Sequence, residues 1–151
     1  MGTIEYEEPD MSVNTVVHAN FRGDARAALD FYQGVFGGDV AVITYGDAHN
    51  VTDESESDQV MWGQVVSAAG FHLMAYDVPG HTPWNRGENA YFVSVRGDSV
   101  EEVTAYWKGL SEGGTVVQPF AESPWALAYG MLRDRFGLTW VLDVPRPYDA
   151  S

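Results

Sequence analysis

The sequence has no cysteine and few positive charges. Without cysteine there can be no disulfide framework, no thiolate metal site and no cysteine nucleophile. One lysine and seven arginines stand against 22 acidic residues, which gives a formal net charge of −14. Too few cations are present to neutralise phosphates, so binding to nucleic acid is excluded. The same charge argues against anionic membrane surfaces.

The sequence also lacks long apolar runs. None approaches the ~18 residues that a membrane-spanning helix needs. The first ten residues are acidic and have no apolar core, so they do not form a signal peptide. We therefore expect a cytoplasmic protein with a mobile acidic leader at 1–12 and a short tail at 145–151. The apolar content of 45% and the length of 151 residues suit one domain, which would bury about 70% of its unfolded surface.

A repeated pattern organises the chain. Arg22-Gly23-Asp24 precedes a helical run that stops at Gly37-Gly38, and Arg96-Gly97-Asp98 precedes another that stops at Gly113-Gly114. Each unit reads strand, Arg-Gly-Asp, amphipathic helix, Gly-Gly, strand. Self-similarity on this scale indicates an internal repeat.

The hydrophobic periodicity predicts two helices and eight strands. The helices span 25–36, with Asp24 as N-cap, and 99–112, with a Ser99–Glu102 capping box. The expected strands are 13–21, 39–45, 59–68, 71–76, 90–95, 115–120, 125–132 and 138–144.

Each half therefore reads βαβββ, over about 13–77 and 88–144. One helix cannot cover both faces of a four-stranded sheet, so the halves are expected to share a face. The expected fold is α+β: a single domain at 13–144, whose curved mixed sheets surround a cup and carry the helices on their outer face.

These residues resemble the vicinal oxygen chelate superfamily of glyoxalase I, extradiol dioxygenases and bleomycin-resistance proteins, and within it the PhnB-like branch. The resemblance spans about 13–144. It is carried by Phe21-x-Gly23-x-Ala25, Ala28-Leu29-x-Phe31-Tyr32, Phe36-Gly37-Gly38, Leu73-Met74 with Asp77, Trp125, Gly130 and Asp134-Arg135-Phe136-Gly137-Leu138-x-Trp140.

The resemblance implies a cup in which metal-dependent relatives hold a divalent ion with four side chains. The first position falls near His18, and the second falls at Trp62-Gly63-Gln64. The other two positions fall on residues that cannot bind a metal: Ala90 or Phe92, and Val141. At most His18 and Gln64 remain, fewer than the three protein ligands usual in catalytic sites. We therefore predict no metal and no other cofactor.

Six residues are predicted to bind a small-molecule ligand in the cup: His18, Asn20, Trp62, Gln64, Trp125 and Tyr129. Aromatic side chains there could hold a flat or apolar molecule. His18 and Glu122 are weak candidates for acid or base catalysis. Trp140 is expected to be a core residue.

The preferred hypothesis is a PhnB-like small-molecule-binding protein, a homodimer as is common in the superfamily, without a catalytic metal. The alternative is a metal-dependent lyase, isomerase or dioxygenase with His18 and Gln64 as a reduced ligand set. A third possibility is a purely structural protein whose cup is filled by its own side chains. A methyltransferase activity has no support, because no G-x-G turn for a nucleotide cofactor is present. A phosphonate pocket would need clustered Arg or Lys, and none is expected on the cup face.

Overall fold

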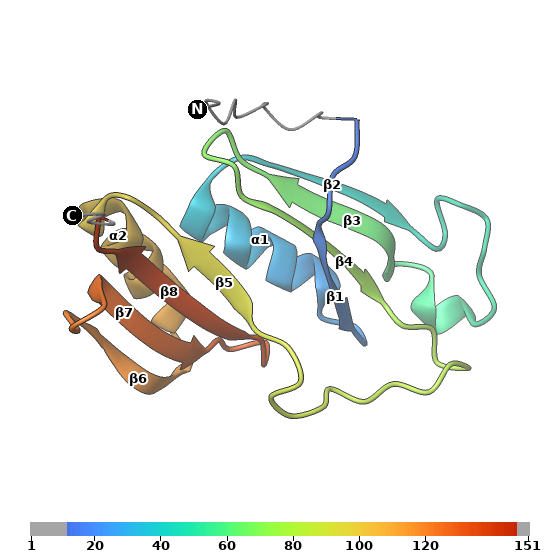
Figure 1. The fold of residues 1–151 in the computed structure, drawn as a ribbon. Coiled ribbons are helices and arrows are strands. Elements are labelled where there is room, and N and C mark those ends of the chain that lie inside the picture. The colour runs from blue at the N-terminus through green and yellow to red at the C-terminus, as the bar shows by residue number, and fades with distance from the viewer. Residues whose placement is uncertain (1–11, 148–151) are drawn as a thin grey trace, which may run out of the picture.

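The computed structural model describes residues 12–147 and contains two four-stranded sheets, each with one long helix (Figure 1). The first half comprises β1 (Val17–Phe21), α1 (Ala25–Phe36), β2 (Asp39–Thr44), a 3-10 turn η1 (Glu54–Glu56), β3 (Val60–Val66) and β4 (His72–Asp77). The second half comprises β5 (Val93–Arg96), α2 (Val100–Ser111), β6 (Thr115–Ala121), β7 (Ala126–Arg133) and β8 (Thr139–Pro145). The predicted α+β fold with two βαβββ repeats is confirmed. Most of the predicted leader lies outside the described residues.

The two sheets have the same topology. Their strand orders are β1-β4-β3-β2 and β5-β8-β7-β6. In both sheets the first strand pairs in parallel with the last, and the remaining pairs are antiparallel. Among residues 12–147, no helix is long and apolar enough to cross a membrane.

Helix α1 has the predicted bounds, whereas the first strand of each half is shorter than predicted. β1 begins at Val17 rather than at residue 13, and β5 begins at Val93 rather than at residue 90. Both are edge strands with a single neighbour in their sheet. Val17 already pairs with Leu73, at the start of β4, and Val93 with Trp140, at the start of β8. Each edge strand thus begins within one or two residues of the point where its neighbour begins.

One hydrophobic core joins the two halves on the helix side of both sheets. Phe36 at the end of α1 stacks on Phe71 at 3.8 Å between ring centroids. Its ring also lies 4.7 Å from Tyr106 of α2 and 5.7 Å from Trp140 of β8. Trp140 is fully buried, as the sequence predicted. Each helix thus covers one face of its own sheet, and the two helices contact each other.

The carboxylate of Asp134, in the turn between β7 and β8, is the polar centre of this core. Its Oδ2 accepts hydrogen bonds from the Tyr32 hydroxyl at 2.6 Å and from Trp140 Nε1 at 2.8 Å. Its Oδ1 accepts from the backbone N–H groups of Phe136 and Leu138. Burial, followed by the negative charge of Asp134, raises the pKa of Tyr32, so this hydroxyl remains a donor at neutral pH. Because Tyr32 belongs to α1, the carboxylate connects the two halves.

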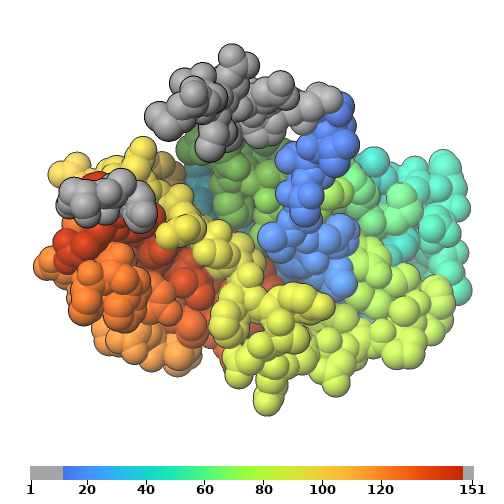
Figure 2. All heavy atoms as spheres, in the orientation of Figure 1, coloured from blue at the N-terminus to red at the C-terminus, as the bar shows by residue number. Residues whose placement is uncertain are grey.

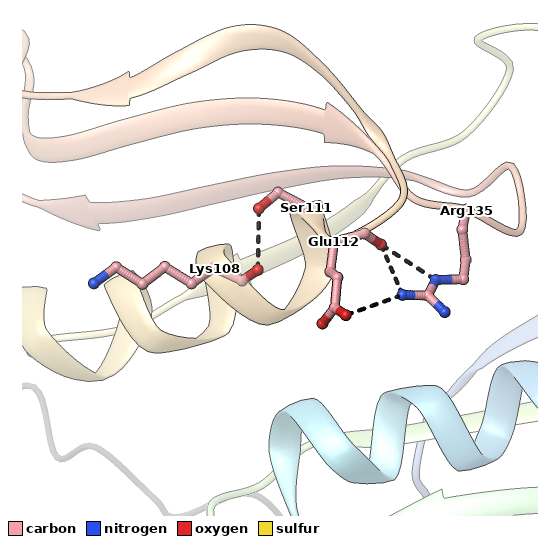
Figure 3. Close-up of polar contacts among 4 residues, drawn as sticks. All are labelled: Lys108, Ser111, Glu112 and Arg135. Carbon is pink, nitrogen blue, oxygen red and sulfur yellow. Dashed lines mark hydrogen bonds and ion pairs between the residues drawn. The ribbon is translucent and has the colours of Figure 1, made fainter.

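Arg135 makes a second connection at the same turn (Figure 3). Its guanidinium donates twice to the backbone carbonyl of Glu112, just after α2. The guanidinium carbon also lies 4.5 Å from the ring centroid of Phe31 on α1. A cation at the C-terminus of α2 complements the helix dipole, and its position over Phe31 adds a cation–π contact.

The start of α1 is capped by a different aspartate from the one predicted. Asp24 occupies the N-cap position, but its side chain makes no capping hydrogen bond. Instead Oδ1 of Asp77, at the end of β4, accepts from the N–H groups of Gly23 and Ala25, and Oδ2 accepts from that of Val60. The distant buried carboxylate thus binds the first N–H group of the helix, whereas an N-cap side chain would bind that of Arg26 or Ala27. The Ser99 cap of α2 is confirmed, because its hydroxyl accepts from the N–H of Glu102.

We predict that Asp77→Ala lowers the free energy of unfolding by about 3 kcal/mol or more, because three backbone donors lose their acceptor and buried unsatisfied donors cost ~1–3 kcal/mol each. Asp24→Ala should change it by less than about 0.5 kcal/mol. Urea denaturation followed by circular dichroism measures both. Equal losses in the two variants would contradict this assignment of the cap.

Candidate functional site

The candidate site lies on the face of each sheet that is turned away from the helices, which we call the open face. Side chains alternate along a strand, and the buried residues of each strand mark its helix side. On the first sheet the open face carries His18, Asn20, Asp39, Ala41, Ile43, Trp62, Gln64, Val66, His72, Met74 and Tyr76. On the second it carries Ser94, Arg96, Leu127, Tyr129, Met131, Arg133, Val141 and Asp143.

Both open faces present apolar side chains to solvent. Ile43 is 42% exposed, Val66 38% and Leu127 37%. Trp125, directly before β7, is 64% exposed. Exposed apolar side chains gathered on one face of a sheet are consistent with a surface that binds a ligand or another protein.

The open faces also differ from the rest of the chain in charge. Asp39 and Asp143 are balanced by Arg96 and Arg133, so the formal charges on these faces cancel in a chain of net charge −14. The expectation that this face has no Arg or Lys is therefore wrong. Arg96 does not stand free, because its Nε lies 3.1 Å from Oδ1 of Asp143.

In the first half, His18 and Gln64 lie in one row across the sheet. Met74 of β4 pairs with His18 on one side and with Gln64 on the other. The two candidates are thus separated by two strand spacings, about 10 Å. His18 Nδ1 lies 2.9 Å from Oδ1 of Asn20, and its ring packs edge-on against Tyr76. With Nδ1–H donating to Asn20, Nε2 of a neutral imidazole remains an acceptor.

Gln64 has a partner that the sequence did not indicate. Its Oε1 lies 2.9 Å from Nε2 of His72. The alternation along β4 places His72 on the same face as Met74, but the diagonal contact to Gln64 depends on the β3–β4 register.

The matching row of the second half has quite different chemistry. Ser94 takes the place of His18, Val141 that of Met74, and Met131 that of Gln64. The third ligand position falls on Ser94 in this register, two residues beyond the expected Phe92. Among residues 12–147, no three His, Asp or Glu side chains are grouped so as to hold a metal ion.

The other predicted residues lie near the start of β7. The rings of Trp125 and Tyr129 meet edge to face, with centroids 5.9 Å apart. Glu122 is exposed and pairs with Arg146, at 2.6 Å between Oε1 and the guanidinium nitrogen. The structure thus groups the candidates of each half on its own open face. That the two faces close on one ligand remains a prediction.

Two cavities lie beside or beyond these faces. A groove of 290 Å³ separates the edge strands β1 and β5, visible as the hollow between their ridges in Figure 2. Phe71 and Tyr106 line it, and it reaches the open faces at His72 and Ser94. A second cavity of 210 Å³ lies between the loop after β2 and the turn after β4. Neither cavity could be predicted directly from the sequence, because each is formed by segments far apart in the chain.

Two βαβββ units with a shared helix-side core and two exposed sheet faces define a protein of the paired βαβββ class. A family model for the Glyoxalase/Bleomycin resistance protein/Dioxygenase superfamily matches residues 15–142. The chain belongs to this superfamily.

Known relatives agree with this assignment. The chain is 30% identical to protein PA1353 from Pseudomonas aeruginosa, whose crystal structure superposes with a TM-score of 0.80 over 89% of this chain and 98% of that one. It is similar in fold to a Bacillus cereus PhnB protein described as a putative 3-demethylubiquinone-9 3-methyltransferase, at 19% identity and a TM-score of 0.67, over 87% of this chain and 99% of that one. It is also 21% identical to protein YjdN of Escherichia coli K12, over 84% of this chain and 92% of that protein.

Proposed function

We propose that the protein is a PhnB-like binder of a small, flat and largely apolar molecule, that the ligand lies on the open faces, and that no catalytic metal takes part. The observation that carries this proposal is the character of those faces. They combine aromatic and apolar side chains with polar ones, and their formal charges cancel in a chain of net charge −14. A sheet surface that served only solubility would carry the same excess of acidic side chains as the rest of the protein.

The side chains on these faces suit such a ligand. Trp62 and the Trp125–Tyr129 pair offer ring surfaces. His18, Asn20 and Gln64 supply a few polar groups that can fix the orientation of the ligand. A mostly apolar site with a small number of placed polar groups is the usual composition of a small-molecule site.

The fluorescent probe 8-anilinonaphthalene-1-sulfonate tests this proposal, since it is flat and aromatic. We expect saturable binding, weakened about tenfold, or ~1.4 kcal/mol, in Trp62→Ala and in Tyr129→Ala. Val100→Ala, which removes an exposed apolar side chain from α2, should leave the affinity unchanged. Unsaturable binding, or equal affinity in all four proteins, would count against the open faces.

We further propose that the protein is a homodimer in which a second copy covers part of the open faces. Two chains of net charge −14 repel each other over most of their surfaces, and the repulsion is least where the formal charges cancel. Exposed Ile43 and Leu127 would then become buried, which supplies the hydrophobic gain.

Light scattering coupled to size-exclusion chromatography should give twice the 16.6 kDa of one chain. Leu127→Glu should shift the protein to monomer, because it would bury a charge in the interface. The control Val100→Glu, on α2, should remain dimeric. A monomeric wild-type protein at tens of micromolar would rule the dimer out.

A metal-dependent lyase, isomerase or dioxygenase is the second candidate. It is favoured by the position of His18 and Gln64, which flank Met74 in one row of the sheet. Two such ligands alone form a weak site.

Metal analysis of protein purified without chelators separates the two candidates. On the preferred proposal, bound nickel, zinc, manganese and iron stay well below one equivalent in the wild type and do not change in His18→Ala. A near-stoichiometric divalent ion that is lost in His18→Ala, but retained in the loop variant His49→Ala, would favour the enzyme.

A further inference from the structure

The 210 Å³ cavity lies away from the open faces, between the loop after β2 and the turn after β4. Its lining residues are Tyr45, Asn50, Val51, Thr52, Glu56, Pro79 and His81. The volume is below the ~300 Å³ at which pockets for drug-sized ligands begin. Any ligand must therefore be small.

The walls of this cavity are held in place by hydrogen bonds. The buried ring of Tyr45 is fixed by its hydroxyl, which donates to the backbone carbonyl of Asp77 at 2.7 Å. Oε2 of Glu56 accepts from the N–H of Gly80 at 2.9 Å. Arg22 donates to the carbonyls of Pro79 and Thr82, which anchors the turn to the end of the neighbouring strand β1. An aromatic ring and a carboxylate are thus presented to the cavity in fixed positions.

The loop that lines the cavity is acidic. Between Gly46 and Gln59 it contains five carboxylates and no lysine or arginine, whereas Arg22 binds the carbonyls of the turn on the other side. Burial raises the pKa of Tyr45, and its electrostatic interactions with Tyr76, Asp77 and Glu56 raise it further. Anions are therefore disfavoured in the cavity, and cations are attracted.

We infer that this cavity is a binding site for a small organic ammonium ion. The ammonium group can pair with the Glu56 carboxylate, which still has acceptor capacity after the bond from Gly80. The Tyr45 ring offers a cation–π contact, and Val51 and Pro79 supply apolar surface for a short alkyl chain. A divalent metal ion fits less well, because it needs several anionic or imidazole ligands and Glu56 and His81 are the only such side chains in the lining.

Titration with n-butylammonium chloride at low ionic strength tests this inference, with the amide signals of Val51 and Gly80 followed by NMR. We expect saturable shifts with the ammonium ion and none with n-butanol, which has the same length and no charge. Glu56→Gln should weaken binding at least tenfold. It keeps an acceptor for Gly80, so the turn should remain in place.

Two controls separate the site from general attraction to an acidic chain. Glu54→Gln removes a charge from the same 3-10 turn outside the cavity lining, and it should bind n-butylammonium as the wild type does. Tyr45→Phe keeps the ring and should also retain binding. Equal weakening by Glu54→Gln and Glu56→Gln, shifts of similar size with n-butanol, or shifts that do not saturate would each overturn the inference.

Discussion

The structure depends on one buried carboxylate. Asp134 accepts hydrogen bonds from two side chains and two backbone groups, and one donor, Tyr32, comes from the other half of the chain. A buried carboxylate is tolerated only when it is fully hydrogen-bonded, so the two halves can pack in few other ways. The helix sides of both sheets are buried in this shared core, so only the open faces of the strands can bind a ligand. The position of the candidate site therefore follows from the packing of the core.

The repeat shows how one scaffold carries two different surfaces. The hairpin turns of both halves keep a glycine with positive φ, Gly70 and Gly137. The first residue of these turns differs between the halves. The Ser67 hydroxyl accepts a hydrogen bond from the N–H of Phe71 in its own hairpin, whereas the Asp134 carboxylate accepts one from Tyr32 of α1. The open faces diverge in the same way: the first carries mostly uncharged polar side chains beside aromatic ones, whereas the second carries three charged side chains among apolar ones. The strands and turns require the same backbone in both halves. Side chains on the open faces do not affect that backbone, so they can differ.

Local signals in the sequence predicted α1 correctly, because helix bounds follow from nearby residues. Strand ends were less predictable, since an edge strand lasts only as long as its neighbour: β1 begins where β4 offers Leu73 as a partner. Asp24 met every local criterion for a cap, yet Asp77 took the role from 53 positions away in sequence. Alternation along β3 and β7 placed Trp62, Gln64 and Tyr129 on the face turned away from the helices, as the structure has them. The contact between Gln64 and His72, like the walls of the small cavity, depends on register and loop closure, which periodicity does not encode.

The distribution of charge connects these features. Among residues 12–147, most acidic side chains lie in loops and on helices, and the strands carry only Asp39, Asp77 and Asp143. Asp77 binds the start of α1 and Asp143 pairs with Arg96, so little unpaired negative charge remains on the strands. The loop that lines the small cavity carries five carboxylates between Asp47 and Asp58, and Arg22 is bound to the turn on the other side. An apolar ligand and a cation would therefore be drawn to different parts of the same chain. Because the two sites share no lining residue, occupation of one leaves the contacts of the other intact, and the two can be tested separately.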